Sequence, residues 1–142
     1  MALSESERAF LEANRSAAMI TVGRDGRPKV ARMAVAMVDG KLWSSGTRDR
    51  ARTKRLRTDP RCTLFVFDAA WRWLGLETDV RLLEGPNVPD QSLRLFRIMQ
   101  DRPTGAVAWF GKDLEPDDFL RLMVDEGRLI YEFEVERSYG MA

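Results

Sequence analysis

The stretch Ala17-Ala-Met-Ile-Thr-Val-Gly-Arg-Asp-Gly-Arg-Pro-Lys-Val30 decides the fold. Its first six residues form a strand-like run, and Asp25-Gly26 is a pair that favours a tight hairpin. A second strand-like run follows over residues 29–38. The pair Asp39-Gly40 then precedes a third run over residues 41–45. The pattern predicts three antiparallel strands joined as a meander.

Three more strand-like runs follow later in the chain. Residues 62–67 and 71–83 are separated only by Asp68-Ala69-Ala70. Between 129 and 136, apolar and polar residues alternate as in a half-buried strand. Short connections and few, peripheral helices favour a mainly β fold, a small six-stranded antiparallel barrel. The length of 142 residues is that of one domain, which we expect to span residues 1–142.

The helices are predicted from their boundary residues. Ser4 and Glu7 have the spacing of a capping box, which predicts a helix over residues 4–14. The other predicted helices are a basic one from Arg48 to the Asp59-Pro60 pair, one capped by Asp90, and one beginning at Pro116 and ending at Gly127.

The amino-acid composition excludes several kinds of chemistry. Hydrophobic residues make up 44% and charged residues 32%, which is typical of a globular protein. The sequence has no histidine, so Ser-His-Asp catalysis and histidine metal sites are excluded. The single cysteine, Cys62, has no partner within the chain for a disulfide or a zinc site. We therefore expect no metal, and a strand cysteine in a reducing compartment.

Nothing in the sequence predicts a targeting or membrane segment. The first residues lack a basic stretch followed by an apolar one, and no apolar run approaches the roughly 18 residues of a membrane span. The expected location is the cytoplasm, with no membrane partner.

The run Arg48-Asp-Arg-Ala-Arg-Thr-Lys-Arg-Leu-Arg-Thr-Asp-Pro-Arg61 concentrates positive charge. It holds seven basic and two acidic residues, a local excess of five in a chain whose net charge is +1. Together with the N–H groups of a helix start, these side chains can converge on a phosphate. A solvated helix face is the plain alternative, because exposed charges contribute little. A nucleic-acid surface is a third, but the near-neutral total charge and the lack of a recognisable motif argue against it.

The remaining candidates for chemistry are aromatic and acidic pairs. Trp71 and Trp73 are two residues apart on a predicted strand, so their side chains share a face. They would line a pocket or pack in a core or an interface. Trp109-Phe110 would cap a pocket or bury against a partner. Glu77 and Asp79 share a strand face but have no recognisable catalytic partner. Because no nucleophile is paired with a base, the catalytic residues stay unassigned and any redox chemistry is expected from a cofactor.

The order of elements resembles the flavin and deazaflavin oxidoreductase superfamily with the split β-barrel fold of pyridoxamine phosphate oxidase. The motifs behind the resemblance are residues 17–30, the basic block 50–61 ending in Leu-Arg-x-Asp-Pro-Arg, and Ser138-Tyr139-Gly140 after the last strand. The short chain looks most like the actinobacterial branch that binds coenzyme F420. The resemblance implies a homodimer with cofactor sites between the subunits, and hydride transfer between the reduced deazaflavin and a small conjugated organic substrate.

The resemblance also assigns site residues. Its cofactor-phosphate positions are Arg50 and Arg52, with Thr53 and Lys54 beside them. Ser44, Ser45 and Thr47 fall where the family contacts the ring and linker, and Met33 and Val35 would lie near the ring. By charge complementarity, the acidic oligoglutamate tail of the cofactor would meet Arg24, Arg27 and Lys29.

Two departures limit the resemblance. Pyridoxamine phosphate oxidases use a substrate-binding histidine and haem-degrading relatives bind iron through histidine, so a chain without histidine fits neither activity. FMN stays an alternative cofactor, since its phosphate would use the same basic helix start. A protein that carries F420 without catalysis is the other alternative.

Overall fold

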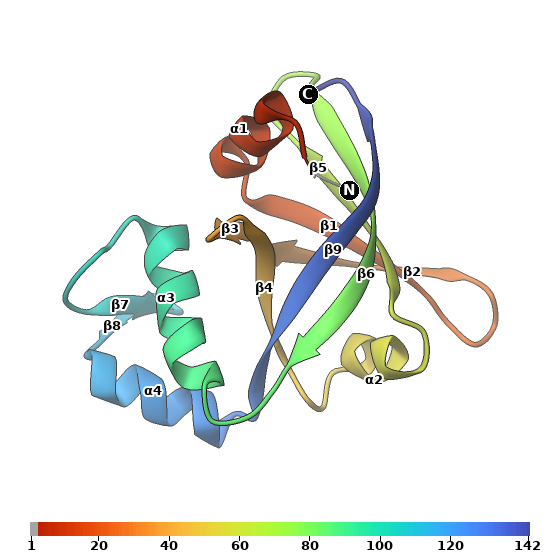
Figure 1. The fold of residues 1–142 in the computed structure, drawn as a ribbon. Coiled ribbons are helices and arrows are strands. Elements are labelled where there is room, and N and C mark those ends of the chain that lie inside the picture. Colours follow the sequence, from red (N-terminus) through yellow and green to blue (C-terminus); the bar gives the residue numbers. More distant parts are fainter. Residues whose placement is uncertain (1–2) are drawn as a thin grey trace.

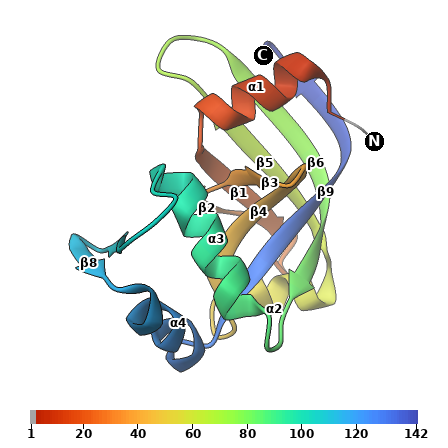
Figure 2. The ribbon, with the colours of Figure 1, turned by 60° about the vertical axis from the view of Figure 1, so that its left-hand side comes forward.

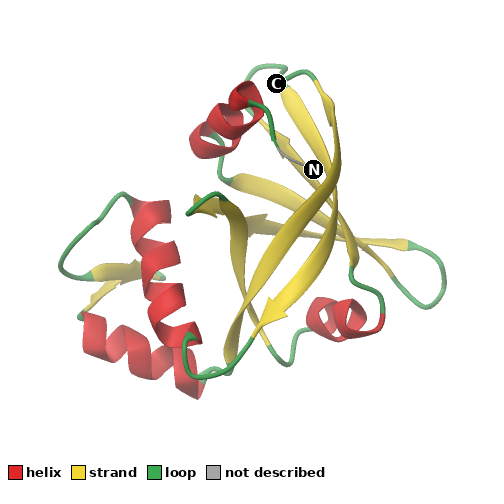
Figure 3. Cartoon of the chain, in the orientation of Figure 1, coloured by secondary structure: helices red, strands yellow, loops and turns green. Residues whose placement is uncertain are grey.

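The computed structural model describes residues 3–142 and has a curled antiparallel sheet with four helices around it (Figures 1 and 3). The main sheet consists of β1 (Ser16–Val22), β2 (Pro28–Ala34), β3 (Ala36–Val38), β4 (Lys41–Thr47), β5 (Arg61–Phe67), β6 (Trp73–Leu83) and β9 (Arg128–Gly140). The helices are α1 (Glu5–Ala13), α2 (Ala51–Thr58), α3 (Val88–Gln100) and α4 (Pro116–Asp125). The predicted mainly β class is confirmed, with seven strands in the main sheet in place of six.

The predicted meander is wrong at Val35. The strand order is β2-β1-β5-β6-β9-β4-β3, so β2 and β3 form opposite edges of the sheet although one residue separates them. The fully buried Val35 points into the core and breaks the predicted strand over 29–38 in two. Its N–H donates to the carbonyl of Arg15 (2.7 Å). Because two strands that follow each other directly in the chain form the opposite edges of the sheet, the sheet must curl until these edges meet.

A side chain bridges the split where the two edges meet. The Ser44 hydroxyl, from β4, donates to the carbonyl of Ala34 at the end of β2 (2.6 Å). Antiparallel pairing of β4 with β9 and of β9 with β6 completes the barrel wall. The long strands β6 and β9 run side by side across the barrel in both views (Figures 1 and 2).

The barrel core is filled by alternate residues of the strands, as the two-residue period requires. Met19, Leu64, Leu76 and Tyr131 are among its fully buried members. The face opposite the core keeps several apolar side chains exposed on β1, β2 and β5. Both faces of this part of the sheet are therefore apolar, although only one is covered within the chain.

All four predicted helices are present, and α2 begins at Ala51, three residues after the predicted Arg48. Ser4 and Glu7 form the capping box, with Ser4 N–H donating to the Glu7 carboxylate (2.9 Å) and Glu7 N–H to Ser4 Oγ (3.1 Å). Helix α4 begins at Pro116, and Gly127 follows its end at a φ of 62°. Helix α3 begins at Val88, before the predicted Asp90, because the extra turn carries a proline near its start.

A short hairpin between α3 and α4 is absent from the sequence prediction. Strands β7 (Val107–Trp109) and β8 (Lys112–Leu114) pair beside the two helices, away from the barrel (Figures 1 and 2). We call residues 88–125 the helical insert. Its own small core holds Val107, Phe119 and Met123, while Leu95 of α3 packs on the barrel.

Gly46 is required by the close approach of Tyr131. The Tyr131 ring lies against the Gly46 Cα, where an added Cβ would overlap the ring. Since Tyr131 is fully buried, its ring has no free space to enter. We expect Gly46→Ala to lower the free energy of unfolding by about 1–3 kcal/mol, measured by urea denaturation.

Gly23→Ala is the matched control for that change. An added Cβ at Gly23 meets the ends of two surface side chains, Lys29 Cε (2.7 Å) and Asp25 Oδ1 (3.0 Å), which can move aside. A shift of no more than about 0.5 kcal/mol is expected there. Equal stability of Gly46→Ala and the wild type would contradict the packing argument.

Candidate functional site

A cavity of about 320 Å³ lies where the end of β2, the middle of β4, the start of α2 and the helical insert meet. Five of the residues predicted for the site line it: Met33, Ser44, Ser45, Arg50 and Arg52. The other lining residues are Arg32, Ala34, Phe96, Met99, Ala108, Trp109, Phe110 and Arg128. Thus residues far apart in the sequence converge on one cavity.

Positive charge dominates the cavity. Four arginines line it, and no carboxylate does. Arg128 is paired with Glu126 (2.7 Å), and Arg32 donates to the Ser16 hydroxyl (3.2 Å). Within residues 3–142, neither Arg50 nor Arg52 forms an ion pair. The cavity is therefore suited to an anionic ligand.

Two buried polar atoms in this cavity have no partner. Ser45 Oγ and Arg52 Nε are buried without a hydrogen bond, and the third such atom in the described part of the chain, Ser92 Oγ, lies outside the cavity lining. An unsatisfied buried polar group costs about 1–3 kcal/mol. Both atoms can hydrogen-bond the oxygens of a phosphate, Arg52 as a donor and Ser45 as a donor through its hydroxyl. This pair fits the phosphate of a flavin-type cofactor.

A buried hydroxyl network holds the start of α2 beside the cavity. The Thr53 hydroxyl donates to the carbonyl of Thr47 (2.7 Å) and is hydrogen-bonded to the Tyr131 hydroxyl. Because the Thr53 proton is used on Thr47, the Tyr131 hydroxyl donates to Thr53. The network ties α2 to β4 and β9, and it fixes the backbone between Arg50 and Lys54.

The remaining predicted residues lie outside the cavity lining. Val35 is fully buried in the barrel core, and Thr53 and Thr47 belong to the hydroxyl network. Lys54 is exposed on α2. Lys29, near the start of β2, is paired with Asp25 (3.2 Å) in the turn before that strand, and Arg24 and Arg27 are exposed nearby.

The rest of the basic run has structural partners. Arg57 forms an ion pair with Glu84 (2.6 Å), Arg61 with Asp59 (2.8 Å), and Arg55 donates to the Thr21 hydroxyl (2.9 Å). The Arg61 guanidinium holds the pKa of the Asp59 carboxyl at about 2. The run therefore divides into a solvated face and two arginines that line the cavity.

Sequence reasoning missed the apolar side of the cavity. Phe96 and Met99 have the spacing of ordinary packing residues on a helix, and Arg32 and Arg128 are single arginines on strands, so neither pair gives a local signal. Arg128 lies over the Trp109 ring, 4.8 Å from its centre. The Trp109-Phe110 pair was a sequence signal, but its place depends on a hairpin that was not predicted.

The structure supplies no separate nucleophile. Burial raises the pKa of the Cys62 thiol to about 12, so the thiolate is absent at neutral pH. Trp71 lies before the start of β6, so it does not share a strand face with Trp73, and neither tryptophan lines the cavity. Glu77 and Asp79 also lie outside the lining. Among residues 3–142, no group of three or more acidic or cysteine side chains is placed to hold a metal ion.

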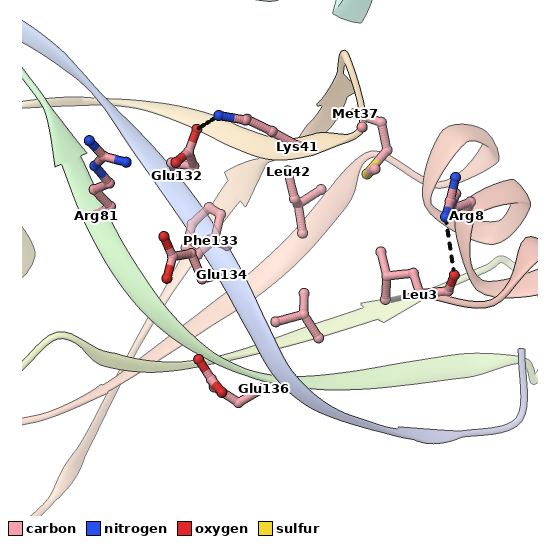
Figure 4. Close-up of a pocket in the computed structure, with 12 residues that line it drawn as sticks. Leu3, Arg8, Met37, Lys41, Leu42, Arg81, Glu132, Phe133, Glu134 and Glu136 are labelled. Atoms are coloured by element: carbon pink, nitrogen blue, oxygen red, sulfur yellow. Dashed lines mark hydrogen bonds and ion pairs between the residues drawn. The ribbon is translucent and has the colours of Figure 1, made fainter. Parts of the chain in front are cut away.

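A larger cavity, of about 570 Å³, lies near α1 and the middle of β9 (Figure 4). Its charges are mixed. Glu132, Glu134 and Glu136 line it together with Arg8, Lys41 and Arg81, and Glu132 is paired with Lys41 (3.6 Å). Glu132 also accepts a hydrogen bond from the Trp43 indole (3.0 Å). This arrangement favours no ligand charge, so the arginine-lined cavity is the candidate site.

Comparison with known proteins gives the family. The family model of pyridoxamine 5′-phosphate oxidase matches residues 3–131. The chain belongs to this family. Its fold is a flavin-type oxidoreductase fold in which the arginine-lined cavity lies beside the split of the barrel. No helix in residues 3–142 has the length and apolar character needed to cross a membrane.

Solved structures show the same fold in proteins of different description. A conserved hypothetical protein of Mycobacterium tuberculosis, Rv2991, has a TM-score of 0.75 and 21% identity, covering 99% of this chain and 86% of its own. An F420 reductase has a TM-score of 0.70 and 18% identity, covering 96% and 98%. HutZ, a haem storage protein of Vibrio cholerae, has a TM-score of 0.67 and 13% identity, covering 99% and 96%. Likeness at these identities shows the fold alone.

The hydroxyl network predicts coupled losses of stability. Tyr131→Phe removes one hydrogen bond and is expected to cost about 1 kcal/mol. Thr53→Val removes two and leaves the Tyr131 hydroxyl buried without an acceptor, at a cost of about 1–3 kcal/mol. Urea denaturation of both variants and the double variant forms a mutant cycle. The double variant should lose less than the two single losses together, whereas strict additivity would contradict the network.

Proposed function

We propose that the protein binds coenzyme F420 and transfers a hydride from the reduced deazaflavin to a small conjugated organic substrate. The observation that carries the proposal is the pair of unpartnered buried atoms, Ser45 Oγ and Arg52 Nε, in a cavity lined by arginines. A phosphate diester satisfies both atoms and neutralises the unpaired charge of Arg50 and Arg52. The likeness in fold to an F420 reductase supports the same cofactor.

Each part of the cavity would have a separate task. Arg50 and Arg52 would hold the phosphate, and Ser45 would orient it. Met33, near the end of β2, and Ser44, in the middle of β4, would lie under the cofactor ring. When bound, the reduced deazaflavin supplies the electron pair as a hydride, and the substrate takes its proton from solvent. The chain then contributes orientation and the exclusion of water by its apolar side chains.

An apolar face on the outside of the sheet supports an arrangement of two subunits. Neighbouring aromatic rings on β5, β6 and β9 form a contiguous stripe: Phe65 lies 5.3 Å from Phe67 and 5.8 Å from Trp73, and Trp73 lies 6.1 Å from Tyr139. Val30 on β2 extends the stripe and is 67% exposed. Large exposed apolar patches mark interaction sites.

We propose that a second copy of the chain covers this face. A groove beside Phe67 and Val30 shares Arg32 with the arginine-lined cavity, so the apolar face reaches the rim of the candidate site. A homodimer through this face would place the cofactor at the subunit boundary. The same phosphate-binding residues permit two alternatives, which are FMN binding and F420 binding without turnover.

The phosphate assignment predicts a difference between two basic residues on α2. We expect Arg52→Ala to raise the Kd for F420 by at least about tenfold, since a charged hydrogen bond contributes roughly 1.5–3 kcal/mol. Lys54→Ala removes the same charge from the exposed face of the helix and should change the Kd by less than about threefold. Titrations that follow tryptophan quenching, with F420 and separately with FMN, measure both.

Three outcomes of these titrations are distinct. Tight binding of F420 over FMN, weakened only by Arg52→Ala, is the expected result. Preference for FMN with the same dependence on Arg52 would move the assignment to the flavin cofactor. Equal loss in both variants, or no binding of either cofactor, would overturn the proposed site.

The dimer assignment is tested on Phe67, which is 52% exposed on the apolar face. Phe67→Glu places a charge in the proposed interface, so sedimentation equilibrium should show monomers in place of dimers. Val124→Glu, a matched change at an exposed apolar residue of α4, should leave the dimer intact. A monomeric wild type, or a Phe67→Glu dimer, would contradict the interface.

A further inference from the structure

Phe110 is a large apolar residue in a position that the fold itself does not favour. Its side chain is 86% exposed at the tip of the β7–β8 hairpin, and it borders the arginine-lined cavity. Both central residues of the turn have positive φ, 47° for Phe110 and 80° for Gly111. Such turns favour Asn-Gly or Asp-Gly, and a bulky residue is strained there.

The folded chain gains little from the Phe110 ring. Within residues 3–142 its aromatic contact is an edge-on approach to Trp109, with ring centres 5.0 Å apart. The exposure of the Phe110 ring and the strain in its backbone together indicate that the ring contacts a partner outside the core of the chain. Backbone strain of this kind concentrates at ligand sites.

The hairpin that presents Phe110 is firmly held. The Gln100 side chain at the end of α3 both donates to the carbonyl of Ala108 and accepts from its N–H, each at 2.8 Å. Arg102, which follows α3, forms an ion pair with Asp113 of β8 (2.9 Å). Trp109 packs on Phe96, with ring centres 5.5 Å apart, and under Arg128. These contacts place Phe110 at the cavity rim as part of the fold.

The cavity has an inner and an outer end of different chemistry. Met33, only 7% exposed, and the unpartnered Ser45 and Arg52 atoms mark the inner end. Phe110 marks the outer end, next to Trp109. On the proposed function, the anionic cofactor fills the inner end, and the exchangeable substrate enters past Phe110.

We propose that Phe110 is a specificity-determining residue that stacks on the planar conjugated ring of the substrate. An aromatic face recognises a flat π-system more strongly than a puckered saturated ring. The substrate class is then a planar aromatic or conjugated acceptor, as opposed to an aliphatic one. This inference rests on the proposed function for the identity of the cofactor, but not for the ring contact.

Two probes of equal charge test the ring contact. Naphthalene-2-carboxylate is planar, and decahydronaphthalene-2-carboxylate has the same carbon skeleton and charge but puckered rings. We would measure both dissociation constants by calorimetry on the full chain, with oxidised F420 present and absent. The wild type should bind the planar probe about three- to tenfold more tightly than the saturated one.

Two variants separate the effect of the Phe110 ring from the effect of the backbone strain at this position. Phe110→Asn removes the ring and suits the turn, so the melting temperature should stay the same or rise while the preference for the planar probe disappears. Phe110→Trp keeps an aromatic face and should keep the preference. Because Phe110 borders the cofactor cavity, the Kd for F420 is measured in both variants and should change less than the Kd for the planar probe.

Each remaining outcome decides the question. No preference in the wild type, or an equal preference in Phe110→Asn, would overturn the inference, as would loss of the dimer in Phe110→Asn. If F420 fails to bind while the planar probe still depends on Phe110, the proposed function falls and the ring contact stands. If F420 binds and the planar preference is absent, the ring contact alone falls.

Discussion

The hydrogen bonds of Thr53 with Thr47 and Tyr131 are the constraint on which the candidate site depends. Leu56 of α2 packs in the barrel core, and these hydrogen bonds fix the first turn of this basic helix to β4 and β9. Arg50 and Arg52 lie between the two hydrogen-bonded residues, Thr47 and Thr53, and both line the cavity. The same tyrosine demands glycine at position 46. The buried Tyr131 side chain therefore takes part both in the packing of the barrel and in the placement of the positively charged residues of α2.

Local sequence signals predicted the elements, and long-range pairing determined their arrangement. Asp25-Gly26 and Asp39-Gly40 made two hairpins, and the alternation after Leu129 made a strand, because turn chemistry and two-residue periodicity act over a few residues. The break at Val35 has no such signal. It follows from the closing of the sheet through β4 and β9, between residues some ninety positions apart in the chain, for which neighbouring residues give no indication.

The candidate site shows the same division. Charge density pointed to Arg50 and Arg52, since seven basic residues in one run stand out in a nearly neutral chain. Arg32 and Arg128 are isolated on strands and reach the cavity only through the fold. The apolar side comes from the helical insert, whose Phe96 and Met99 look like ordinary core residues of a helix. Val35 and Thr53, assigned through family resemblance, hold the structure around the cavity.

The most direct test of the account is a crystal structure of the protein with F420. The account predicts the cofactor phosphate within hydrogen-bonding distance of Arg52 Nε and Ser45 Oγ, with Arg50 beside it. Such a complex would satisfy the two buried atoms of the cavity that lack partners in residues 3–142. A phosphate bound elsewhere, with Arg52 Nε and Ser45 Oγ still unpartnered, would contradict it.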